Sequence, residues 1–284
     1  MKAFSLNLRG SLRQYTRPAV MGILNVTEDS FYAGSRAFSD TDISARAARL
    51  AAEGADFIDV GAYSTRPGAA EVPGAAEVPE TEETARLLRA IPLIRRVAPD
   101  VPLSVDTFRA SAARAAIGAG ADIVNDVSGG RLDPEMFDAV AEMRVPYILG
   151  HMRGTPADRQ RHCEYDDLTA DVIREMAEGY RRLVLAGVTD IIIDPCFGFS
   201  KTLEQNYELL RHLEFFEVFN APVLVGVSRK SMITKLLDIS SQEALPGTTA
   251  LDAFALDRGA AILRVHDVLP AVQTVKIHQA LSNL

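Results

Sequence analysis

The chain has 284 residues, of which 48% are hydrophobic and 24% charged, a balance typical of a globular protein with one large α/β domain or two smaller ones. Its net charge of −8 argues against the basic face of a nucleic-acid-binding protein, but allows a small cluster of Arg, Lys and His that binds an anion. No run of about 18 apolar residues occurs, so we expect no membrane span.

The first residues and the cysteines predict a cytoplasmic protein that begins with a hairpin. Asn7 and Arg9 interrupt the first apolar run, so we expect no signal peptide. Cys163 and Cys196 lie far apart, without metal or redox spacing, and are expected to be free thiols in a reducing compartment. Residues 1–17 alternate around a central glycine and predict a short N-terminal β-hairpin.

After the hairpin, short apolar runs alternate with amphipathic segments, as in strands buried on both faces and followed by helices. The expected strands are 19–24, 57–60, 102–105, 122–124, 145–149, 191–193, 222–227 and 261–264. The expected helices are 42–53, 80–97, 110–117, 134–143, 167–186, 203–213, 230–237, 247–257 and 268–281. This alternation predicts an α/β fold, a single (β/α)8 TIM barrel over residues 18–284.

Three features of the sequence bear on this prediction. A doubly wound open sheet is the alternative, but it favours a glycine-rich dinucleotide turn after its first strand, and NVTEDSF at 25–31 is not one. No Pro-, Ser- or Gly-rich linker divides the chain, so we expect one domain over residues 1–284. Residues 68–73 and 74–79 both read GAAEVP, and two copies predict a lengthened surface loop, since a solenoid needs more units.

Polar residues follow all eight expected strands, at the barrel end where active sites lie. They are Asn25, Asp59, the run STRPG at 64–68, Asp106, Thr107, Asn125, Asp126, His151, Asp194, Ser228, Arg229, Lys230, Arg264 and His266. Some have structural alternatives: Thr107 could cap a helix, Asp106 could pair with an arginine, and His151 could be a buried, hydrogen-bonded histidine.

These residues are of two chemical kinds. The carboxylates and amides that suit a flat, donor-rich heterocycle are Asp106, Asn125 and Asp194. The groups that suit an anion are Arg66, Lys230, Arg264 and His266, together with the run Ser228-Arg229-Lys230. No Ser–His or Cys–His elbow is recognisable, so the predicted chemistry is positioning and electrostatic stabilisation as a phosphate leaves a heterocycle. A Mg²⁺ held by Asn25 and substrate phosphates would leave no further trace.

The motifs at these strand ends resemble those of the dihydropteroate synthases, in the same order over residues 19–267. They are MGILNVT at 21–27, DSF at 29–31, STRPG at 64–68, VDT at 105–107, ND at 125–126, HM at 151–152, GTP at 154–156, DP at 194–195, FGF at 197–199 with Lys201, GVSRK at 226–230 and RVHD at 264–267. The resemblance implies a homodimeric barrel that condenses 6-hydroxymethyl-7,8-dihydropterin diphosphate with 4-aminobenzoate, a transferase of folate biosynthesis and a target of sulfonamide drugs.

Carried over position by position, the resemblance implies three groups of binding residues. The pterin group is Asp106, Asn125, Asp194, Phe199 and Lys230. The diphosphate group is Asn25, Arg264 and His266, with Mg²⁺ at Asn25. The 4-aminobenzoate group is Thr65, Arg66, Pro67, Phe199, Ser228 and Lys230. The implied mechanism is dissociative: diphosphate leaves first, Asp106 stabilises the pterin-methyl cation, and Lys230 and the diphosphate group complete the catalytic set.

The sequence departs from the family pattern in four places. Glu28 and Tyr32-Ala33-Gly34 replace a Pro and a Ser-Asp-Gly in the first loop, Gly150 replaces a Met, Cys196 replaces a Gly, and the GAAEVP repeat follows STRPG. The repeat is either a tolerated surface insertion or a change that weakens sulfonamide binding more than substrate binding, and so confers resistance.

Two other functions stay open. A methyltetrahydrofolate-binding domain of a corrinoid methyltransferase would share the barrel and the pterin-facing residues, but it needs no diphosphate clamp, so Arg264, His266 and STRPG argue against it. A noncatalytic pterin-binding paralogue is disfavoured by the presence of Asn25, Asp106, Lys230 and His266, while the altered first loop keeps it open.

Overall fold

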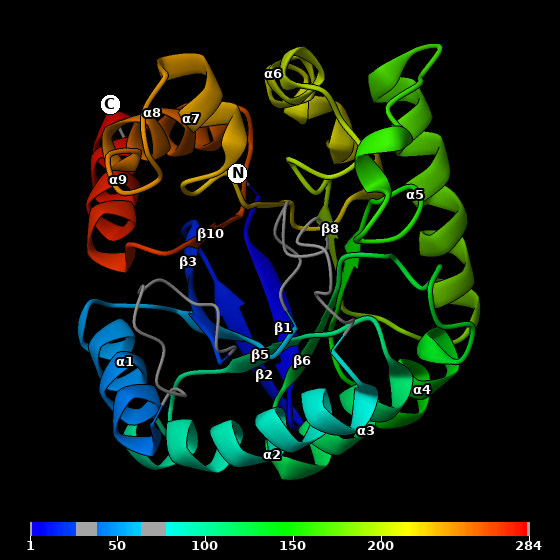
Figure 1. Ribbon diagram of the computed structural model, residues 1–284, viewed down its shortest axis with the longest axis vertical. Coiled ribbons are helices and arrows are strands. Elements are labelled where there is room, and N and C mark those ends of the chain that lie inside the picture. The colour runs from blue at the N-terminus through cyan, green and yellow to red at the C-terminus, as the bar shows by residue number, and fades with distance from the viewer. Residues whose placement is uncertain (1, 27–38, 64–77, 283–284) are drawn as a thin grey trace.

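The computed structural model describes residues 2–26, 39–63 and 78–282 and shows a ring of helices around a barrel of strands (Figure 1). The barrel strands are β3 (Ala19–Asn25), β4 (Phe57–Gly61), β5 (Leu103–Asp106), β6 (Ile123–Asp126), β7 (Tyr147–Gly150), β8 (Ile191–Asp194), β9 (Leu224–Val225) and β10 (Ile262–Val265). They are paired in parallel in the order β8-β7-β6-β5-β4-β3-β10-β9, and a parallel bridge from Ile193 to Val223 joins the two ends. The predicted eight-stranded barrel is confirmed.

The helices follow the strands as predicted. They are α1 (Asp40–Ala52), α2 (Glu80–Val97), α3 (Ala110–Ala119), α4 (Met136–Met143), α5 (Leu168–Leu185), α6 (Leu203–Arg211), α7 (Ser231–Leu237), α8 (Leu245–Asp257) and α9 (Val268–Ser282), with 3-10 turns η1 (Arg159–Arg161) and η2 (Leu213–Phe219). Within the described part of the chain, no helix has the length and apolar character needed to cross a membrane.

Helix α1 illustrates how the sequence produces these elements. The Ser39 side chain accepts the backbone N–H of Asp42 while the Asp42 side chain accepts that of Ser39, a capping box that fixes the first turn. Ile43, Ala47 and Leu50 are spaced four and three residues apart, lie on one face and are buried. The helix therefore begins at a local signal and is held on the sheet by its apolar face.

The N-terminal hairpin consists of β1 (Phe4–Leu8) and β2 (Ser11–Tyr15), which confirms the prediction. Arg9 and Gly10 in the turn both have positive φ, 53° and 77°, the geometry of a tight type I′ hairpin. Leu6 is buried in the cluster of strand residues at the barrel's N-terminal end, and the Tyr15 ring centroid lies 5.0 Å from that of Phe57. The hairpin thus covers that end, opposite the polar strand ends.

The segment after α6 differs in form from the prediction. Helix was expected over 203–213, but α6 ends at Arg211 and the chain continues as η2. Phe216 and Phe219 are both buried there, because a three-residue spacing brings them onto the same face of a 3-10 turn. Phe215, one residue earlier, is 55% exposed.

Several predicted features lie outside the described residues. They are Glu28, residues 32–34, Thr65, Arg66, Pro67 and most of the GAAEVP repeat.

Candidate active site

Arg264 on β10 joins carboxylates from two other strands. Its Nε donates a hydrogen bond to Asp59 Oδ2 on β4 at 2.6 Å, and its Nη2 donates to Asp106 Oδ2 on β5 at 2.7 Å. Burial opposes the charge of Arg264, but the two carboxylates more than offset this and hold its pKa above the ordinary value. Residues that are 205 and 158 positions apart in the sequence therefore form one ionic cluster.

The proton affinity of Asp106 in this cluster is strongly raised. Burial raises the pKa of Asp106 to about 7, an effect that Arg264 opposes and that the negative charge of Asp59 reinforces. The sequence left open whether Asp106 pairs with an arginine or faces a ligand. The ion pair with Arg264 is present, and Asp106 is still 20% exposed, so its side chain also remains accessible to a ligand.

Asp59 is a residue to which the sequence analysis assigned no role. It is fully buried, and its Oδ2 accepts a second hydrogen bond, from Asn125 Nδ2 on β6, at 3.1 Å. Its position within the apolar run FIDV gave only a weak signal, a charged residue in a strand otherwise suited to the core. Asn125, predicted to contact the heterocycle, thus lies beside the Arg264 cluster.

Asp194 and Lys230 form a second charged group. Burial lowers the pKa of Lys230 to about 8, while the nearby Asp194 opposes that change. Burial likewise raises the pKa of Asp194, and Lys230 is the main opposing charge. Lys230 Nζ donates to the Phe197 carbonyl at 2.6 Å and lies 5.0 Å from the centroid of the Phe199 ring, within cation–π range. An acceptor, a donor and an aromatic face therefore meet here.

Ser228 and His266 are in direct contact. Ser228 Oγ lies 3.1 Å from His266 Nδ1, and it also accepts the backbone N–H of His266 at 3.1 Å. Ser228 was predicted to bind 4-aminobenzoate and His266 to bind diphosphate. The contact makes the two predicted subsites neighbours.

Asn25 offers an acceptor that suits a hard cation. Its Oδ1 lies 2.9 Å from where a Cβ on Gly61 would stand, so a side chain at 61 would require this amide to move. Over the described residues, no group of three or more His, Cys, Asp or Glu is arranged to hold a metal ion. A Mg²⁺ at Asn25 would therefore take its other ligands from substrate oxygens and water, as Mg²⁺ commonly does.

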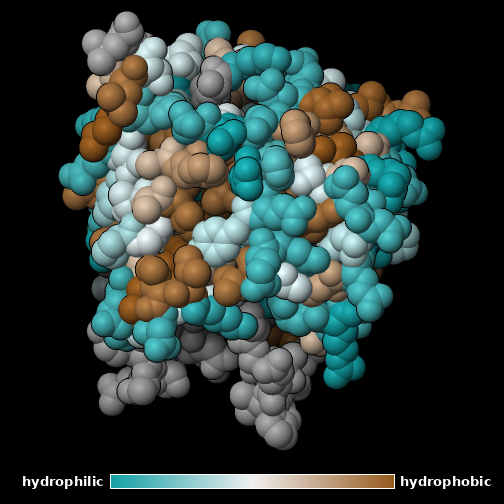
Figure 2. Space-filling model, turned by 90° about the horizontal axis from the view of Figure 1, so that it is seen from above, coloured by the Kyte–Doolittle hydropathy of each residue, from teal (hydrophilic) through white to brown (hydrophobic). Residues whose placement is uncertain are grey.

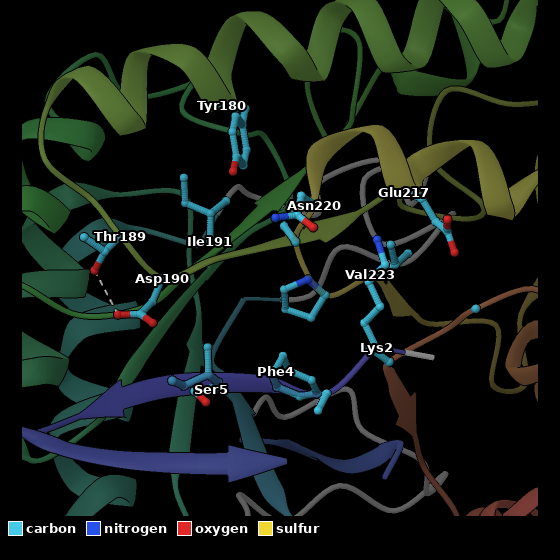
Figure 3. A pocket seen from close by; sticks show the side chains of 16 residues that line it. Lys2, Phe4, Ser5, Tyr180, Thr189, Asp190, Ile191, Glu217, Asn220 and Val223 are labelled. Carbon is cyan, nitrogen blue, oxygen red and sulfur yellow. Dashed lines mark hydrogen bonds between the residues drawn. The ribbon is translucent and has the colours of Figure 1, made fainter. Parts of the chain in front are cut away.

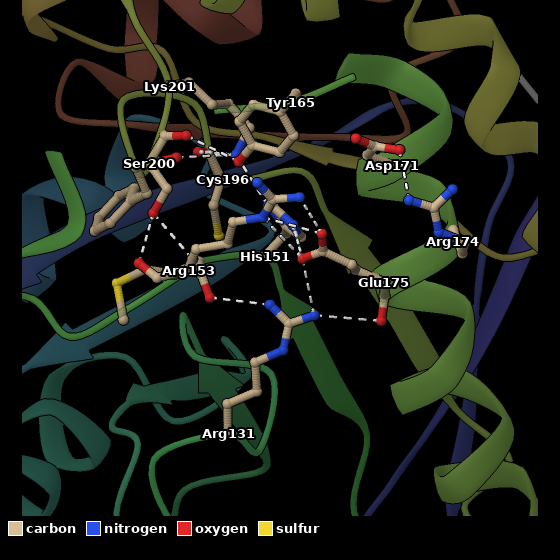
Figure 4. A network of polar contacts seen from close by, with 12 residues as sticks. Arg131, His151, Arg153, Tyr165, Asp171, Arg174, Glu175, Cys196, Ser200 and Lys201 are labelled. Carbon is tan, nitrogen blue, oxygen red and sulfur yellow. Dashed lines mark hydrogen bonds and ion pairs between the residues drawn. The ribbon is translucent and has the colours of Figure 1, made fainter. Parts of the chain in front are cut away.

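His151 belongs to a polar network beneath the site (Figure 4). It is fully buried, with Nε2 3.1 Å from Glu175 Oε2 and Nδ1 3.1 Å from Lys201 Nζ. Burial lowers the pKa of His151 to about 3, so the ring is neutral and accepts from the lysine. Lys201 Nζ also donates to the Phe199 carbonyl at 3.0 Å. His151 is thus a buried, hydrogen-bonded histidine, as one of the two alternatives predicted. Its network holds the loop that carries Phe199.

The guanidinium of Arg229 is occupied by a carboxylate and by two loop carbonyls. Its Nε and Nη2 donate to the two oxygens of Asp267, at 2.7 and 3.0 Å, and its Nη1 donates to the carbonyls of Ser241 and Gln242. With these donors occupied, Arg229 braces the loops that carry Ser228 and His266. The expectation that the whole run Ser228-Arg229-Lys230 faces an anion is wrong for its central residue.

Cys196 adopts the left-handed conformation that its replacement of a family glycine would suggest. Its φ is 54°, a conformation that costs a non-glycine residue roughly 1–2 kcal/mol. The side chain is buried against Val127 and Met152, and burial raises the pKa of the thiol well above its ordinary value. Cys196 is therefore an unreactive part of an apolar wall.

Gly150 cannot take the family's methionine in this chain. A Cβ there would lie 2.5 Å from the Asp126 carbonyl oxygen and 2.7 Å from Val127 Cα, both backbone atoms. We expect Gly150→Ala to lower the free energy of unfolding by about 1–3 kcal/mol through overpacking. Gly118→Ala, in open space within α3, is the matched control and should stabilise the protein slightly. Urea denaturation of both variants measures the difference, and equal midpoints would contradict the close approach.

A separate cavity of about 310 Å³ lies at the other end of the barrel, beside β1 (Figure 3). Among its lining residues are Phe4, Tyr180, Asp190 and Glu217. Its charged lining residues are Lys2, Asp190 and Glu217, so it lacks the cluster of cations that a diphosphate requires. The polar strand ends are the better candidate for the active site.

Comparisons with known proteins give a consistent result. Residues 21–266 match the family described as pterin binding enzyme. The dihydropteroate synthase of Escherichia coli K12 is 41% identical over 99% of this chain and 96% of its own length. A Yersinia pestis dihydropteroate synthase with a sulfonamide drug superposes with a TM-score of 0.90 at 38% identity, covering 99% of both chains. The Xanthomonas albilineans enzyme in complex with 7,8-dihydropteroate gives 0.86 at 38% identity, covering 99% of this chain and 100% of its own.

Proposed function

The chain belongs to the dihydropteroate synthases of the pterin-binding enzyme family, and from this membership we propose how its residues perform the reaction. The reaction joins 6-hydroxymethyl-7,8-dihydropterin diphosphate to 4-aminobenzoate and releases 7,8-dihydropteroate and diphosphate. The observation that carries the assignment of roles is the meeting of two groups at one barrel end: Asp106 and Asn125, which suit the heterocycle, and Arg264, which suits the anion.

The pterin ring is held by Asp106, Asn125, Asp194, Phe199 and Lys230. A carboxylate at Asp194 accepts from ring N–H and amino groups, and the ammonium of Lys230 donates to ring acceptors. The Phe199 ring covers an apolar face, and its position beside Lys230 supports a shared role. The amide of Asn125 is fixed by Asp59 and so presents a defined orientation to the ring.

The diphosphate is held by Asn25, Arg264 and His266. Arg264 contributes a permanent positive charge, and His266 lies beside it on the chain after β10. Asn25 would hold a Mg²⁺, which when bound supplies positive charge to the leaving diphosphate. The position of Oδ1 beside Gly61, which has no side chain to displace it, supports this assignment.

The bond between the pterin methylene carbon and the diphosphate oxygen breaks first, and its electron pair leaves with the diphosphate. Asp106 stabilises the resulting cation, because its carboxylate is held close by and partly shielded from water. The amine of 4-aminobenzoate then attacks the methylene carbon and loses a proton. Positioning and charge complementarity supply the catalysis, without a covalent intermediate on the protein.

The 4-aminobenzoate site consists of Ser228, Lys230 and Phe199, with Thr65, Arg66 and Pro67 from the segment outside the described residues. The contact between Ser228 and His266 supports a position next to the diphosphate. Arg109 contacts both described ends of that segment: it lies over the Tyr63 ring at 5.4 Å and donates to the Val78 carbonyl at 3.1 Å. An anchored base is what a substrate-binding loop requires.

The function is tested by diphosphate release from the pterin substrate, with and without 4-aminobenzoate, in the presence of Mg²⁺. We expect release that depends on Mg²⁺ and formation of dihydropteroate when both substrates are present. Release of no diphosphate in either case would contradict the proposal and favour a noncatalytic pterin-binding protein.

The GAAEVP repeat is proposed to alter drug selectivity, because it directly follows residues assigned to the 4-aminobenzoate site. Deleting residues 74–79 removes one copy and is expected to lower the sulfonamide inhibition constant relative to the KM for 4-aminobenzoate. Both constants are measured on the same preparations of the full chain. An unchanged ratio would show that the repeat is a tolerated surface insertion.

We also propose a homodimer formed through α7, α8 and α9. Their exposed apolar residues are Leu236, Leu237, Phe254, Leu269, Ile277 and Leu281. Figure 2 shows hydrophobic patches on the left side, the side on which these helices lie in Figure 1. Light scattering should give twice the chain mass of 30.8 kDa, and Ile277→Glu should reduce it to one chain. The same mass for both proteins would contradict this interface.

The remaining proposals concern location and domain organisation. A cytoplasmic location is supported by two free cysteines, which suit a reducing compartment. A single domain over residues 1–284 is supported by the packing of Leu6 and Tyr15 of the hairpin against the barrel strands.

A further inference from the structure

We propose that Asp59 is a positioning residue that sets the orientation of Arg264 and Asn125 together, and so couples the diphosphate subsite to the pterin subsite. The inference rests on the proposed function, which gives those two residues their ligands. Asp59 itself touches neither substrate in this assignment.

One oxygen of Asp59 serves both partners. Oδ2 accepts from Arg264 Nε at 2.6 Å and from Asn125 Nδ2 at 3.1 Å. Because the bond to Asp59 uses Nε of the guanidinium, it fixes the plane of this group and with it the direction of the two terminal nitrogens. Because Nδ2 of the amide is used, the rotation of the Asn125 side chain about its terminal bond is fixed as well.

The surroundings of Asp59 indicate that stability alone does not account for it. The side chain is fully buried, and its second oxygen, Oδ1, has no hydrogen-bond partner among the described residues. A buried carboxylate oxygen without a donor is unfavourable for folding and calls for an explanation in terms of function. A carboxylate that must hold two functional side chains from different strands provides one.

Asp59→Asn is the variant that tests this inference, because it keeps the volume and removes the charge. The new amide can turn its NH2 group towards Arg264 and Asn125, which are themselves donors, so that no hydrogen bond forms. It can instead turn its oxygen towards them, and a neutral amide oxygen is a weaker acceptor than a carboxylate. Isothermal titration of the full chain with 6-hydroxymethylpterin and, separately, with inorganic diphosphate and Mg²⁺ measures each subsite. We expect both dissociation constants to rise about 10-fold or more.

The matched control is Asp56→Asn. Asp56 also pairs with an arginine, Arg17, through two hydrogen bonds of 3.0 and 2.7 Å, and it lies just before β4 at the opposite end of the barrel. We expect this variant to bind both ligands as the unsubstituted protein does. If Asp59→Asn does not fold, Asp59→Ser is used in its place, since a serine leaves room for water.

A double variant separates positioning from a general structural effect. Arg264→Met should weaken diphosphate binding more than pterin binding, and Asn125→Ala should weaken pterin binding more than diphosphate binding. If Asp59 acts through Arg264, adding Asp59→Asn to Arg264→Met should cause no further loss of diphosphate affinity. Additive losses, or an effect of Asp59→Asn on only one ligand or neither, would overturn the inference. Failure of the unsubstituted protein to bind either ligand would instead overturn the proposed function and the inference with it.

Discussion

Asp106→Asn is expected to lower kcat by about 100- to 1000-fold while the protein keeps its fold. The amide has the same shape and its oxygen can still accept a hydrogen bond from Arg264, but it has no charge with which to stabilise a cation on the pterin methylene. Single-turnover release of diphosphate measures the step directly, without contributions from product release. A decrease of less than tenfold would show that the carboxylate of Asp106 does not carry the charge stabilisation.

The same residue predicts the pH dependence of the reaction. Because burial raises the pKa of Asp106 to about 7, its carboxyl becomes protonated as the pH falls below that value. We expect kcat/KM for the pterin substrate to decrease towards acid pH and to level off above pH 7, since only the charged form stabilises the cation. An acid decrease of the same size in Asp106→Asn would assign the titration to another group.

The free energy of unfolding should change with pH in the direction opposite to that of kcat/KM. A carboxyl whose pKa is higher in the folded protein than in the unfolded chain binds its proton more tightly when folded, so the free energy of unfolding rises as the pH falls from about 7 towards about 4. Asp252 in α8 adds to this trend, because burial raises its pKa to about 8. Urea denaturation at several pH values, on the unsubstituted protein and on Asp106→Asn, isolates the contribution of Asp106.

Local patterns in the sequence were sufficient to predict the barrel and the hairpin. The barrel strands are short apolar runs with a polar residue at or shortly after the end, and such a run is buried on both faces when helices cover the sheet. Asn25 and Asp106 could be selected in this way because each ends its strand, and Asn125 because it stands one residue before the end of β6. The alternation of elements then determined that these ends meet at one side of the barrel.

Contacts across the barrel could not be predicted, because they depend on which side chains point inward. Asp59 lies within a strand, and only the structure shows that Arg264 reaches it. Arg229 and Lys230 are adjacent in the sequence, yet Arg229 pairs with Asp267 while Lys230 reaches the Phe197 carbonyl. A positive φ of 55° at Arg229 turns the chain before Lys230. No local sequence pattern predicted this conformation.

Two departures from the family pattern have a joint explanation in the structure. In the sequence, Gly150 stands where the family has a methionine, and Cys196 stands where it has a glycine. The backbone of Asp126 and Val127 occupies the space that a side chain at 150 would need. Cys196 adds a buried side chain beside Val127, which a glycine would lack. The Cys196 side chain therefore contributes to the apolar wall, and its backbone adopts a left-handed conformation.

Arg264→Met should have the largest combined effect on activity and stability. It removes the cation shared by Asp59 and Asp106, one fully buried and the other 20% exposed. Removing one partner of a buried ion pair costs about 3–5 kcal/mol, because the remaining charge is left uncompensated. We expect a loss of that order in the free energy of unfolding, and a decrease in kcat of at least about 100-fold because the leaving diphosphate loses a charge-assisted contact.

A second substitution separates the two losses. Asp59→Asn in the Arg264→Met background removes one of the two stranded carboxylates, so part of the lost stability should return, whereas the activity should not. Urea denaturation measures stability and single-turnover diphosphate release measures activity, each on the unsubstituted chain, on Arg264→Met and on the double variant. Stability that stays low in the double variant would mean that Arg264 stabilises the fold by packing. Activity that returns with stability would mean that Arg264 has no role in diphosphate departure beyond neutralising Asp59.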